Sequence, residues 1–574
     1  MNFKLVINNL SKEDFYKDNL LILDKYLEKK IKNKKLNYKI QEYETLNHEH
    51  RHYVYNYLNT LSEKIIYELK DQLNLIHKTN FDANSWKILI GPWLNNFLRI
   101  CYNRFYKIKK TINNNNISEV TTFYCSDNDF TPIDNFDLVH YCNNDDWNAV
   151  LYSKVLKFFI LNLNNQTINL NLDLQTNKKK NLKSFLLKVF SFFLSFFLKH
   201  NDAIIVNSYL PKTENIKLNF LLKQVPQIWN LFKVKKKEYN SELRKRIILS
   251  EGKIDFEKFV NKLIPICIPT CHLESFIEIN NEIKRLSLPK NPKFIFTSNN
   301  YEYDEIFKLY TVLNKNKSTP YIIGQHGSYL SGVDNSFFKE SSGADYYLEW
   351  GKDGFNKKED GFNFKMVNRK IKKNKNGKIL ILDSPYGTNK KIYNRMDENF
   401  IKEEWLHKLL SSLKKELHEH VVLKLHTSFK QREDSYILKI KSICPKIKIE
   451  KNNKAIFNLF KQSRCVVHCY DSTGILETMI SNIPTFCIWP NEFNHIAKKY
   501  HEIYNNLKKN KIFFLDPKEL AEMLNYNFEN YEKWWLKSDT MDAKNNFLNK
   551  FSIIPKKNST QILANKLLEF SKIE

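Results

Sequence analysis

The sequence predicts an α/β protein made of parallel, doubly wound sheets, and two observations lead to this prediction. From residue 291 onward, short apolar runs alternate with segments of helix length, which is the pattern of consecutive βα units. Ten of the twelve glycines lie between residues 324 and 474, where tight turns between strands and helices need them. We therefore expect two Rossmann-like domains, with extra N-terminal helices and a C-terminal helical tail.

The N-terminal part of the chain carries weaker signals. Its first 80 residues are rich in lysine and predict helices. The apolar segment 86–94 predicts a short buried strand that runs into a turn, and residues 95–107 predict a helix. Residues 111–180 are expected to mix strands with polar loops.

The βα units after residue 291 are assigned one by one. Strands are expected at 293–298, 320–324, 344–350, 378–382, 420–425, 446–450, 465–469 and 484–489. Helices are expected at 304–314, 400–417, 454–462 and 474–481. A Lys/Asn-rich stretch near 365–377 separates two groups of units. We therefore expect an N-terminal domain over 1–365, a C-terminal domain over 366–545 and a helical tail over 546–574.

The strong positive charge of the chain is a weak guide to its partners. The 574 residues include 91 Lys and Arg against 63 Asp and Glu, a net charge of +28. Only ten of the 91 are Arg, and the lysines accompany many Asn and Ile, a mixture that an A/T-rich coding sequence produces without selection for anion binding. Because no nucleic-acid-binding motif is found, we expect no nucleic acid partner.

The nine cysteines indicate a reducing compartment and no metal centre. Their number is odd and no two C-x-x-C pairs occur, whereas zinc sites usually take four ligands from such pairs. We expect buried thiols, no essential metal and no cofactor. The first residues show no signal-peptide pattern, so we expect a cytoplasmic protein.

One segment, 184–199, is rich in phenylalanine. Its polar residues recur every three or four positions and form one narrow stripe on an otherwise apolar helix. Such a helix is about 22 Å long, which is shorter than the ~30 Å hydrocarbon core of a bilayer. Two interpretations stay open: a helix buried between domains, or a helix inserted shallowly into the inner surface of the membrane.

The first candidate site follows the strand expected at 320–324. Gln325, His326 and Gly327 lie where the chain leaves this strand, and ligands of open α/β sheets bind at the carboxyl ends of strands. Gly327 lets the backbone approach a ligand closely, and histidine suits proton transfer near neutral pH. We expect His326 to act as the catalytic base, with Gln325 in the same catalytic turn.

A second candidate site lies between an expected buried strand and the helix at 474–481. The free amide groups at the start of that helix, with the Ser and Thr hydroxyls, suit an anion, and simple helix capping explains the same residues equally well. The residues expected to bind a nucleotide phosphate here are Asp471, Ser472, Thr473, Gly474 and Glu477.

A third group follows the strand expected at 420–425. His426 and Arg432 flank two hydroxyls and a lysine, a combination that suits the phosphate oxygens of a nucleotide. Solvated loops often have the same composition. We assign His426 and Arg432 to the nucleotide because their strand belongs to the same expected sheet as the second site.

These motifs, in this order on two Rossmann-like halves, resemble those of GT-B type transferases, which implies that the two domains face each other across a cleft. The chain is similar to transferases encoded in bacterial O-antigen and capsule gene clusters, a resemblance that implies assembly of a surface polysaccharide. Gly91 and Trp93, with Arg104, would lie on the acceptor side of the cleft or in its structural wall. The matching segments are 85–94, 323–327, 347–351, 471–478, 482–485 and 534–535.

The layout is also similar to that of CDP-glycerol glycerophosphotransferases and, more distantly, to that of bacterial β-Kdo transferases. In the former, a His-Gly turn supplies a base, and a second His with a Ser-Ser block holds the nucleotide phosphates. The similarity implies His326 as base and His426, Ser472 and Thr473 as phosphate ligands. The block from Asp471 reads Asp-Ser-Thr-Gly rather than Asp-Tyr-Ser-Ser, so the donor class stays open.

One main hypothesis and two alternatives follow. The main hypothesis is a metal-independent cytoplasmic glycosyltransferase that transfers a sugar from a nucleotide-activated donor to a glycan or lipid-linked acceptor, with possible peripheral contact to the inner membrane surface. The first alternative is transfer of glycerophosphate from CDP-glycerol. The second is a non-catalytic, membrane-associated scaffold of the polysaccharide machinery.

Overall fold

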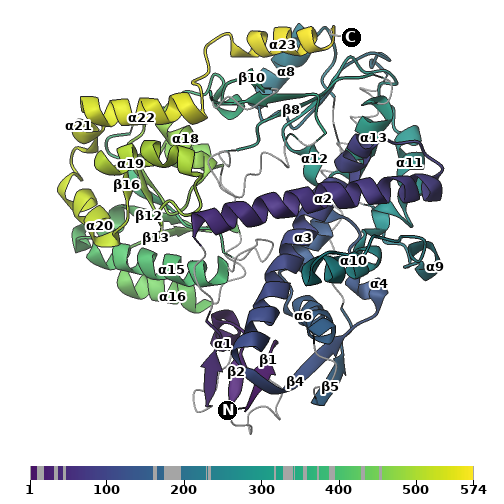
Figure 1. Ribbon diagram of the computed structural model, residues 1–574. Coiled ribbons are helices and arrows are strands. Elements are labelled where there is room, and N and C mark those ends of the chain that lie inside the picture. The colour runs from purple at the N-terminus through teal and green to yellow at the C-terminus, as the bar shows by residue number, and fades with distance from the viewer. Residues whose placement is uncertain are drawn as a thin grey trace.

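Three parallel sheets form the framework of the molecule in the computed structural model (Figure 1). The first and second sheets have five strands each, and the third has six. Every strand pair among the described residues is parallel. The structure describes residues 2–8, 19–30, 37–42, 47–159, 164–172, 196–227, 229, 234–315, 318–327, 341, 343–352, 358–371, 374–386, 395–427, 434–451, 455–490 and 492–572.

The first sheet, at the N-terminal end, has the strand order β3-β2-β1-β4-β5. Its strands are β1 (Asn2–Val6), β2 (Leu20–Ile22), β3 (Tyr38–Ile40), β4 (Asn116–Tyr124) and β5 (Asn164–Asn169). Its helices are α1 (Lys25–Lys30), α2 (His48–His77), α3 (Ala83–Asn114), α4 (Asp127–Phe130), α5 (Asn135–Tyr141) and α6 (Asp145–Phe159). The sequence did not predict this sheet, because β2 and β3 are only three residues long and lie in Lys-rich surroundings.

The second sheet has the order β10-β9-β8-β7-β6, so consecutive strands are neighbours. Its strands are β6 (Ile204–Val206), β7 (Ile295–Thr297), β8 (Tyr321–Gly324), β9 (Tyr346–Glu349) and β10 (Lys358–Asp360). Its helices are α8 (Lys212–Leu221), α9 (Ser241–Arg244), α10 (Asp255–Cys267), α11 (Phe276–Arg285), α12 (Asn300–Tyr303) and α13 (Glu305–Lys315), with 3-10 turns η2 (Thr270–His272) and η4 (Phe364–Met366).

The third sheet has the order β13-β12-β11-β14-β15-β16, which is the order of a doubly wound nucleotide-binding fold. Its strands are β11 (Lys378–Leu382), β12 (Val421–Lys424), β13 (Lys448–Glu450), β14 (Ser463–His468), β15 (Thr485–Ile488) and β16 (Phe513–Phe514). Its helices are α15 (Arg395–Ser412), α16 (Asp434–Ile443), α17 (Ile456–Phe460), α18 (Thr473–Ile480), α19 (His501–Lys509), α20 (Pro517–Tyr526), α21 (Tyr531–Trp535) and α22 (Ser538–Phe551), with 3-10 turns η5 (Lys415–His420) and η7 (Lys498–Tyr500). The last helix, α23 (Ser559–Phe570), packs against α8.

The two faces of the second sheet belong to different hydrophobic cores. Ile204, Ile295 and Ile323 pack with the first sheet and its helices, whereas Ile205 and Phe296 pack with the C-terminal part of the chain. This alternation follows from the two-residue period of a strand. The second sheet is therefore the central layer, with the first unit on one face and α8 and α23 on the other.

The chain passes between the second and third sheets twice, and the two passages touch. Asn363, in the outgoing passage, donates its backbone N–H to Ile553 O at 3.2 Å and its side-chain Nδ2 to Ser552 Oγ at 2.9 Å. Ser552 and Ile553 lie in the return passage between α22 and α23. The crossing of these passages is one of the places where the two halves touch.

Helix α2 forms a further connection, and it crosses most of the width of the molecule (Figure 1). At its C-terminal end, His77 Nε2 donates to His272 O at 2.9 Å, beside the helices of the second sheet. At its N-terminal end, the ring of His48 packs edge-on against His501 of α19, with the ring centroids 5.6 Å apart. The helix therefore contacts both halves.

The predicted α/β class with parallel Rossmann-like halves is confirmed, and three boundaries are corrected. The first 80 residues contain three strands and not helices alone. Segment 86–94 is part of α3 rather than a strand, because an apolar run that is buried on all sides fits a buried helix as well as a strand. The boundary expected at 545/546 falls inside α22, so the tail begins only after Phe551.

Most of the Phe-rich segment, 184–195, lies outside the described residues, and the four residues that follow form an exposed turn. In the described part of the chain, no helix combines the length and the apolar character needed to cross a membrane. All nine cysteines are buried free thiols.

Candidate active site

The carboxyl ends of three neighbouring strands of the second sheet bring His326 together with Tyr209 and Asn299. His326 follows β8, Tyr209 follows β6 and Asn299 follows β7. Tyr209 Oη lies 3.2 Å from His326 Nε2 and accepts a hydrogen bond from Asn299 Nδ2 at 2.9 Å. His326 is half-buried, so its imidazole is held by a neighbour and still reaches the surface.

Gln325 builds the turn that presents His326. Its side chain is only 1% exposed, and its Oε1 accepts from Trp350 N at 2.7 Å while its Nε2 donates to Gly327 O. Both ends of the amide are thus bound to backbone. Gly324 precedes the turn, and a Cβ there would meet Phe364 Cε2 at 2.5 Å, so only glycine fits. The structure therefore places Gln325 behind the turn, where it positions His326.

The second candidate site lies at the carboxyl end of β14, where the chain turns into α18. His468, the last residue of β14, is fully buried, with Nε2 3.2 Å from Thr478 Oγ1 and Nδ1 3.4 Å from Ser472 Oγ. Burial lowers the pKa of His468 to about 3, so this imidazole is neutral. A Cβ on Gly474 would meet His468 Cε1 at 2.9 Å, which explains the glycine at the start of α18.

Ser472 and Asp471 have different roles in this turn. Ser472 occupies the N-cap position of α18, but its side chain makes no capping hydrogen bond. Asp471 Oδ2 accepts from Tyr504 Oη at 3.1 Å and lies 3.4 Å from His495 Nε2. Thr473 is half-buried at the first position of the helix. The first amide groups of α18 are thus left without a cap from Ser472, as an anion site requires.

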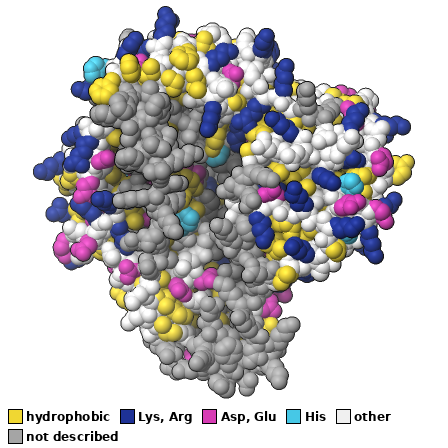
Figure 2. Space-filling view, turned by 180° about the vertical axis from the view of Figure 1, so that it is seen from behind, with side chains coloured by type: hydrophobic (Ala, Val, Ile, Leu, Met, Phe, Trp, Pro, Cys, Tyr) yellow, Lys and Arg dark blue, Asp and Glu magenta, His cyan; other side chains and the backbone are white. Residues whose placement is uncertain are grey.

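Lys365, in η4, links the two candidate sites. Its Nζ lies 4.8 Å from the centre of the Tyr209 ring and 3.8 Å from Glu477 Oε1 of α18. Burial raises the pKa of Glu477, and the charges of Lys365 and Arg369 oppose that rise. The lysine therefore joins the His326 turn of the second sheet to α18 of the third. Seen from behind, the surface is hollowed in its middle, and histidine side chains reach the surface there (Figure 2).

His426 also lies at the carboxyl edge of the third sheet, after β12. It is half-buried and packs edge-on against Tyr470, with ring centroids 6.1 Å apart. Tyr470 directly precedes Asp471, so His426 stands next to the second candidate site. Arg432 lies outside the described residues.

The structure does not bring Gly91, Trp93 and Arg104, which were expected on the acceptor side of the cleft, to this site. Trp93 and Arg104 are 0% and 2% exposed in α3, and Gly91 is buried in the same helix. Arg104 is held inside the first unit, where its Nη2 donates to Asn148 Oδ1 at 2.7 Å and to Cys142 O at 3.3 Å. These residues serve the core of the first unit.

A buried lysine contacts α3 next to Pro92. Pro92 has no N–H to donate within the helix, so Ile88 O, four residues before it, loses its helical partner. Lys308 of α13 donates its Nζ to the neighbouring carbonyl, Leu89 O, at 3.0 Å. The same ammonium lies 2.7 Å from Glu305 Oε1, and all of these side chains are buried.

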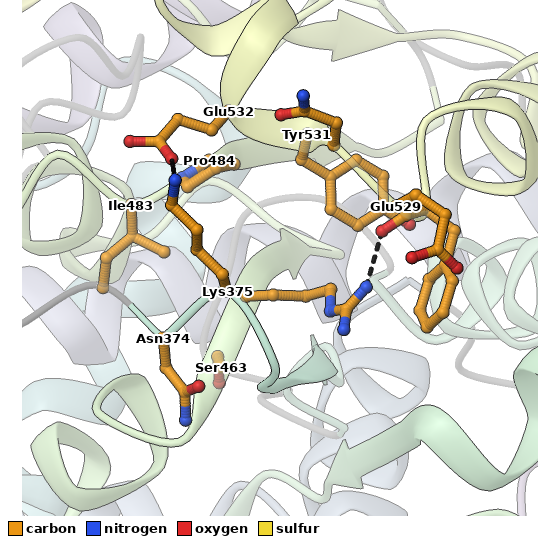
Figure 3. A pocket seen from close by; sticks show the side chains of 11 residues that line it. Asn374, Lys375, Ser463, Ile483, Pro484, Glu529, Tyr531 and Glu532 are labelled. Carbon is orange, nitrogen blue, oxygen red and sulfur yellow. Dashed lines mark hydrogen bonds and ion pairs between the residues drawn. The ribbon is translucent and has the colours of Figure 1, made fainter.

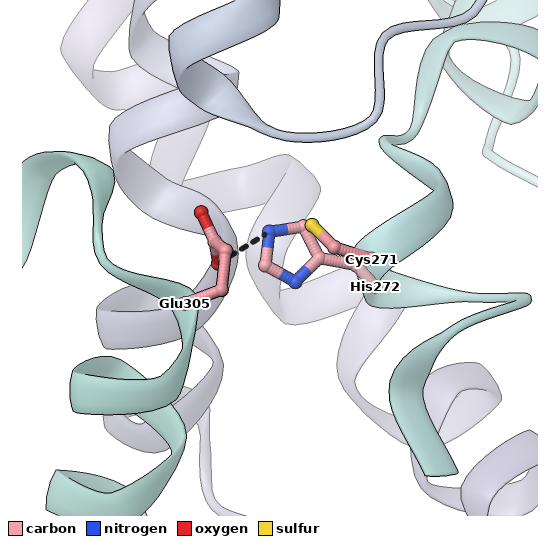
Figure 4. A group of neighbouring side chains, drawn as sticks. All are labelled: Cys271, His272 and Glu305. Atoms are coloured by element: carbon pink, nitrogen blue, oxygen red, sulfur yellow. Dashed lines mark ion pairs between the residues drawn. The ribbon is translucent and has the colours of Figure 1, made fainter. Parts of the chain in front are cut away.

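Glu305 also belongs to the one group of His, Cys and acidic side chains in the described residues whose spacing suits a metal ion (Figure 4). Its partners there are Cys271 and His272, and His272 Nε2 lies 3.4 Å from Glu305 Oε2. Burial lowers the pKa of His272 and raises that of Cys271 well above its usual value. Because the Lys308 ammonium already pairs with the carboxylate, the group does not suit an additional cation.

A shallow pocket lies at the opposite, amino end of the third sheet (Figure 3). Arg464 lines it, but its Nε donates to Gly377 O at 2.9 Å and its Nη1 to Phe528 O at 2.6 Å. Lys375 pairs with Glu532 at 3.0 Å. Arg464 and Lys375 are thus already paired, and none of the sequence-predicted residues lies there.

Sequence reasoning missed Tyr209, Lys365, His495 and Tyr504. Tyr209 and Lys365 are each isolated in sequence from the motifs that they join. His495 lies in the loop after β15, and only this position after a buried strand could have indicated it from the sequence. Tyr504 sits inside an ordinary amphipathic helix.

Comparisons with known proteins add the following. The family model described as LIC12162 family transferase matches residues 5–567. The wall teichoic acid polymerase TagF is 15% identical over 52% of this chain and 86% of its own, with a TM-score of 0.32. MurG of Acinetobacter baumannii is 11% identical over 52% and 77%, with a TM-score of 0.29. MnaA of S. aureus, solved with UDP, is 9% identical over 78% and 95%, with a TM-score of 0.33. No curated protein sequence matches the chain. These structures are too remote to add to what the sheets themselves show.

Proposed function

Because this chain belongs to the LIC12162 family of transferases, we propose that it transfers a sugar from a nucleotide-activated donor to a hydroxyl group of a glycan or lipid-linked acceptor. The observation that carries the proposal is the contact of Lys365 with both Tyr209 and Glu477. It holds the carboxyl edges of two parallel sheets together, and such edges are where α/β folds bind their ligands. The edge of the second sheet carries His326 as a base, and the edge of the third sheet carries the N-terminus of α18.

His326 would receive the proton of the acceptor hydroxyl. For this role Nε2 would carry the hydrogen and donate it to Tyr209 Oη, a tautomer in which Nδ1 is the basic nitrogen. Tyr209 is then a positioning residue, because it fixes the ring and its tautomer. The acceptor oxygen forms a bond to the anomeric carbon, and the bond from that carbon to the donor phosphate breaks.

The departing phosphate takes the bonding electron pair and gains negative charge. The first amide groups of α18, the hydroxyls of Ser472 and Thr473, and His426 would meet that charge at the edge of the third sheet. The Asp471 carboxylate accepts a hydrogen bond from Tyr504 and lies beside His495, so it would hold the turn in place. None of these steps uses a metal ion.

A nucleotide-binding measurement tests the proposal. We would record the melting temperature of the purified protein with CMP, CDP, UDP, GDP and dTDP, each with and without EDTA. A nucleotide at about 100 times its Kd adds about 2.7 kcal/mol to the free energy of unfolding. We expect one nucleotide to stabilise the protein, to the same extent with EDTA. Stabilisation by none of the five would refute the proposal.

Two variants locate the binding site. Thr473→Val removes one hydroxyl at the start of α18 and is expected to weaken nucleotide binding about tenfold. Thr213→Val, at the exposed start of α8, is the matched control and should leave the affinity unchanged. If both variants bound the nucleotide with the same affinity, the phosphate would not bind at the start of α18.

We further propose that the acceptor is a surface polysaccharide intermediate of the O-antigen or capsule type. This part rests on the resemblance of the sequence motifs. Incubation with a lipid extract and the radiolabelled donor that the nucleotide screen selects tests it. Label in the lipid phase supports a lipid-linked acceptor. A response to CDP alone, with glycerophosphate rather than sugar transferred, would favour the CDP-glycerol alternative.

A further inference from the structure

The second sheet carries a group of exposed apolar side chains at the amino end of β6. Phe196 and Phe197, in the turn before this strand, are 70% and 68% exposed. Phe220 and Ile216 of α8 are 65% and 45% exposed. Large apolar side chains exposed in such a group usually mark an interaction surface.

The two segments meet at the start of β6. Helix α8 ends beside this strand, where Gln224 Oε1 accepts from Ala203 N and Gln224 Nε2 donates to Ala203 O, both at 2.9 Å. Phe220 lies in the last turn of α8, and Phe197 lies a few residues before Ala203. We call the surface formed by residues 196–199 and the outer side of α8 the α8 face.

Among the described residues, the exposed charges of the α8 face are positive. Lys199, Lys212 and Lys217 are exposed on it, and Lys223 is exposed just beyond the end of α8. The only acid of α8, Glu214, points inward, where it accepts from Asn368 Nδ2 at 2.9 Å and from Thr560 Oγ1. Figure 2 shows hydrophobic side chains between Lys and Arg side chains at the end of the molecule where α8 and α23 lie in Figure 1.

Helix α23 and the segment before it add apolar and basic side chains beside α8, together with one exposed acid, Glu569. Ile562 on this helix is 43% exposed, and Ile554 before it is 51% exposed. Lys556 and Lys557 are exposed between them. Helix α23 is fixed to α8 through the Thr560–Glu214 hydrogen bond, so both helices present one continuous rim.

We infer that the α8 face docks on an anionic phospholipid surface, with the phenylalanine rings in the headgroup layer and the lysines on the lipid phosphates. Aromatic rings surrounded by lysines combine the two contributions that bind a protein to such a surface. No helix in the described residues is suited to crossing the bilayer, so the contact is peripheral. The charge of the face selects lipid phosphate over a neutral partner.

The position of the face has a consequence that rests on the proposed function. Helix α8 begins three residues after Tyr209, which contacts His326. Helix α8 thus runs from the turn that would receive the acceptor to the exposed phenylalanines at the amino end of β6, a length of about 15 Å. A lipid-linked acceptor held at the membrane would extend along α8 over this distance to reach the turn.

Co-sedimentation with lipid vesicles tests the docking. The wild-type protein should bind phosphatidylcholine vesicles that contain phosphatidylglycerol, and bind pure phosphatidylcholine vesicles more weakly. The double variants Phe196→Ser/Phe197→Ser and Ile216→Ser/Phe220→Ser should each lower the partition constant about tenfold or more. Lys212→Glu/Lys217→Glu should do the same, because each lysine near an anionic surface contributes about fivefold.

A matched control replaces equally exposed apolar residues elsewhere. Leu438→Ser/Tyr526→Ser removes side chains that are 69% and 89% exposed on α16 and α20 and should bind vesicles like wild type. Absence of wild-type binding, equal binding to both vesicle types, or unchanged binding by the α8-face variants would overturn the inference. The nucleotide-induced rise in melting temperature should be unchanged in these variants, which separates this test from that of the proposed function.

Discussion

The buried imidazole of His468 makes the stability of the third sheet depend on pH. In the folded protein its pKa is about 3, because burial disfavours the charged form, whereas an unfolded histidine has the ordinary value of 6.5. Since the folded pKa is the lower one, the full contribution to stability is present above pH 6.5 and is lost as the pH falls towards 3. Between pH 8 and pH 5 the loss is about 2 kcal/mol of unfolding free energy.

A difference measurement isolates this contribution. His468→Gln keeps a polar group between Ser472 and Thr478 but cannot take up a proton. We would measure urea unfolding by tryptophan fluorescence for both proteins at pH 8, 7, 6 and 5. The wild type should be the more stable protein at pH 8, and its advantage should shrink by about 2 kcal/mol at pH 5. Other buried histidines cancel in the difference.

An exposed histidine provides the control. His200→Gln should follow the wild-type curve at every pH, because His200 is exposed in both states. The reasoning would be refuted if the stability difference between wild type and His468→Gln stayed constant from pH 8 to pH 5. The histidine would then take up its proton equally in the folded and unfolded protein.

Three further substitutions test other parts of the structure. Gly91→Ala should raise the free energy of unfolding by about 1 kcal/mol, because its Cβ would meet Lys87 Cγ at 3.6 Å and α3 would gain a better helix former. Lys308→Met should cost about 3–5 kcal/mol, because Glu305 would be left buried without its partner, and EDTA should not change the wild-type melting temperature. Tyr209→Phe should lower kcat about tenfold and alter the pH–kcat profile, with an unchanged donor KM.

Each has a matched control. Gly252→Ala should destabilise, because its Cβ would lie 2.4 Å from Lys258 N. Lys262→Met and Tyr124→Phe alter exposed side chains and should leave stability and kcat unchanged. If Gly91→Ala lowered the stability, Gly91 would be needed for the backbone conformation of α3. If Lys308→Met changed the stability only slightly, Glu305 would be protonated in the folded protein. If Tyr209→Phe kept full activity, His326 would not depend on Tyr209.

The third sheet could be predicted almost completely, for a physical reason. Strand β11 was expected at its observed bounds, because a Lys-Ile-Leu-Ile-Leu run between turn residues is typical of a parallel strand buried on both faces. The same reasoning failed at 86–94, where an equally apolar run is a helix that is buried all round. Pro92 favours an end to the element, but the helix continues past it, and Lys308 donates a hydrogen bond to Leu89 O in the turn before it.

The candidate site could be predicted only in part. His326 and the turn that begins at Asp471 each follow a strand. They could be predicted because ligands of open α/β sheets bind at the carboxyl ends of strands. Tyr209 and Lys365 gain their meaning from contacts between distant segments, and no local pattern carries that information. The 3-10 turn of Lys365 lies where the sequence indicates only a linker between domains.

The contacts that join the two halves are spread over separate elements. Asn363 bonds to Ser552 beside the crossing of the two passages, Lys365 of η4 lies 3.8 Å from Glu477, and α2 packs its His48 against α19. A rigid body that is held at several separate points cannot rotate about one of them while the others stay in place. Any change in the orientation of the third sheet relative to the second therefore breaks or remakes contacts on η4 and α2 as well.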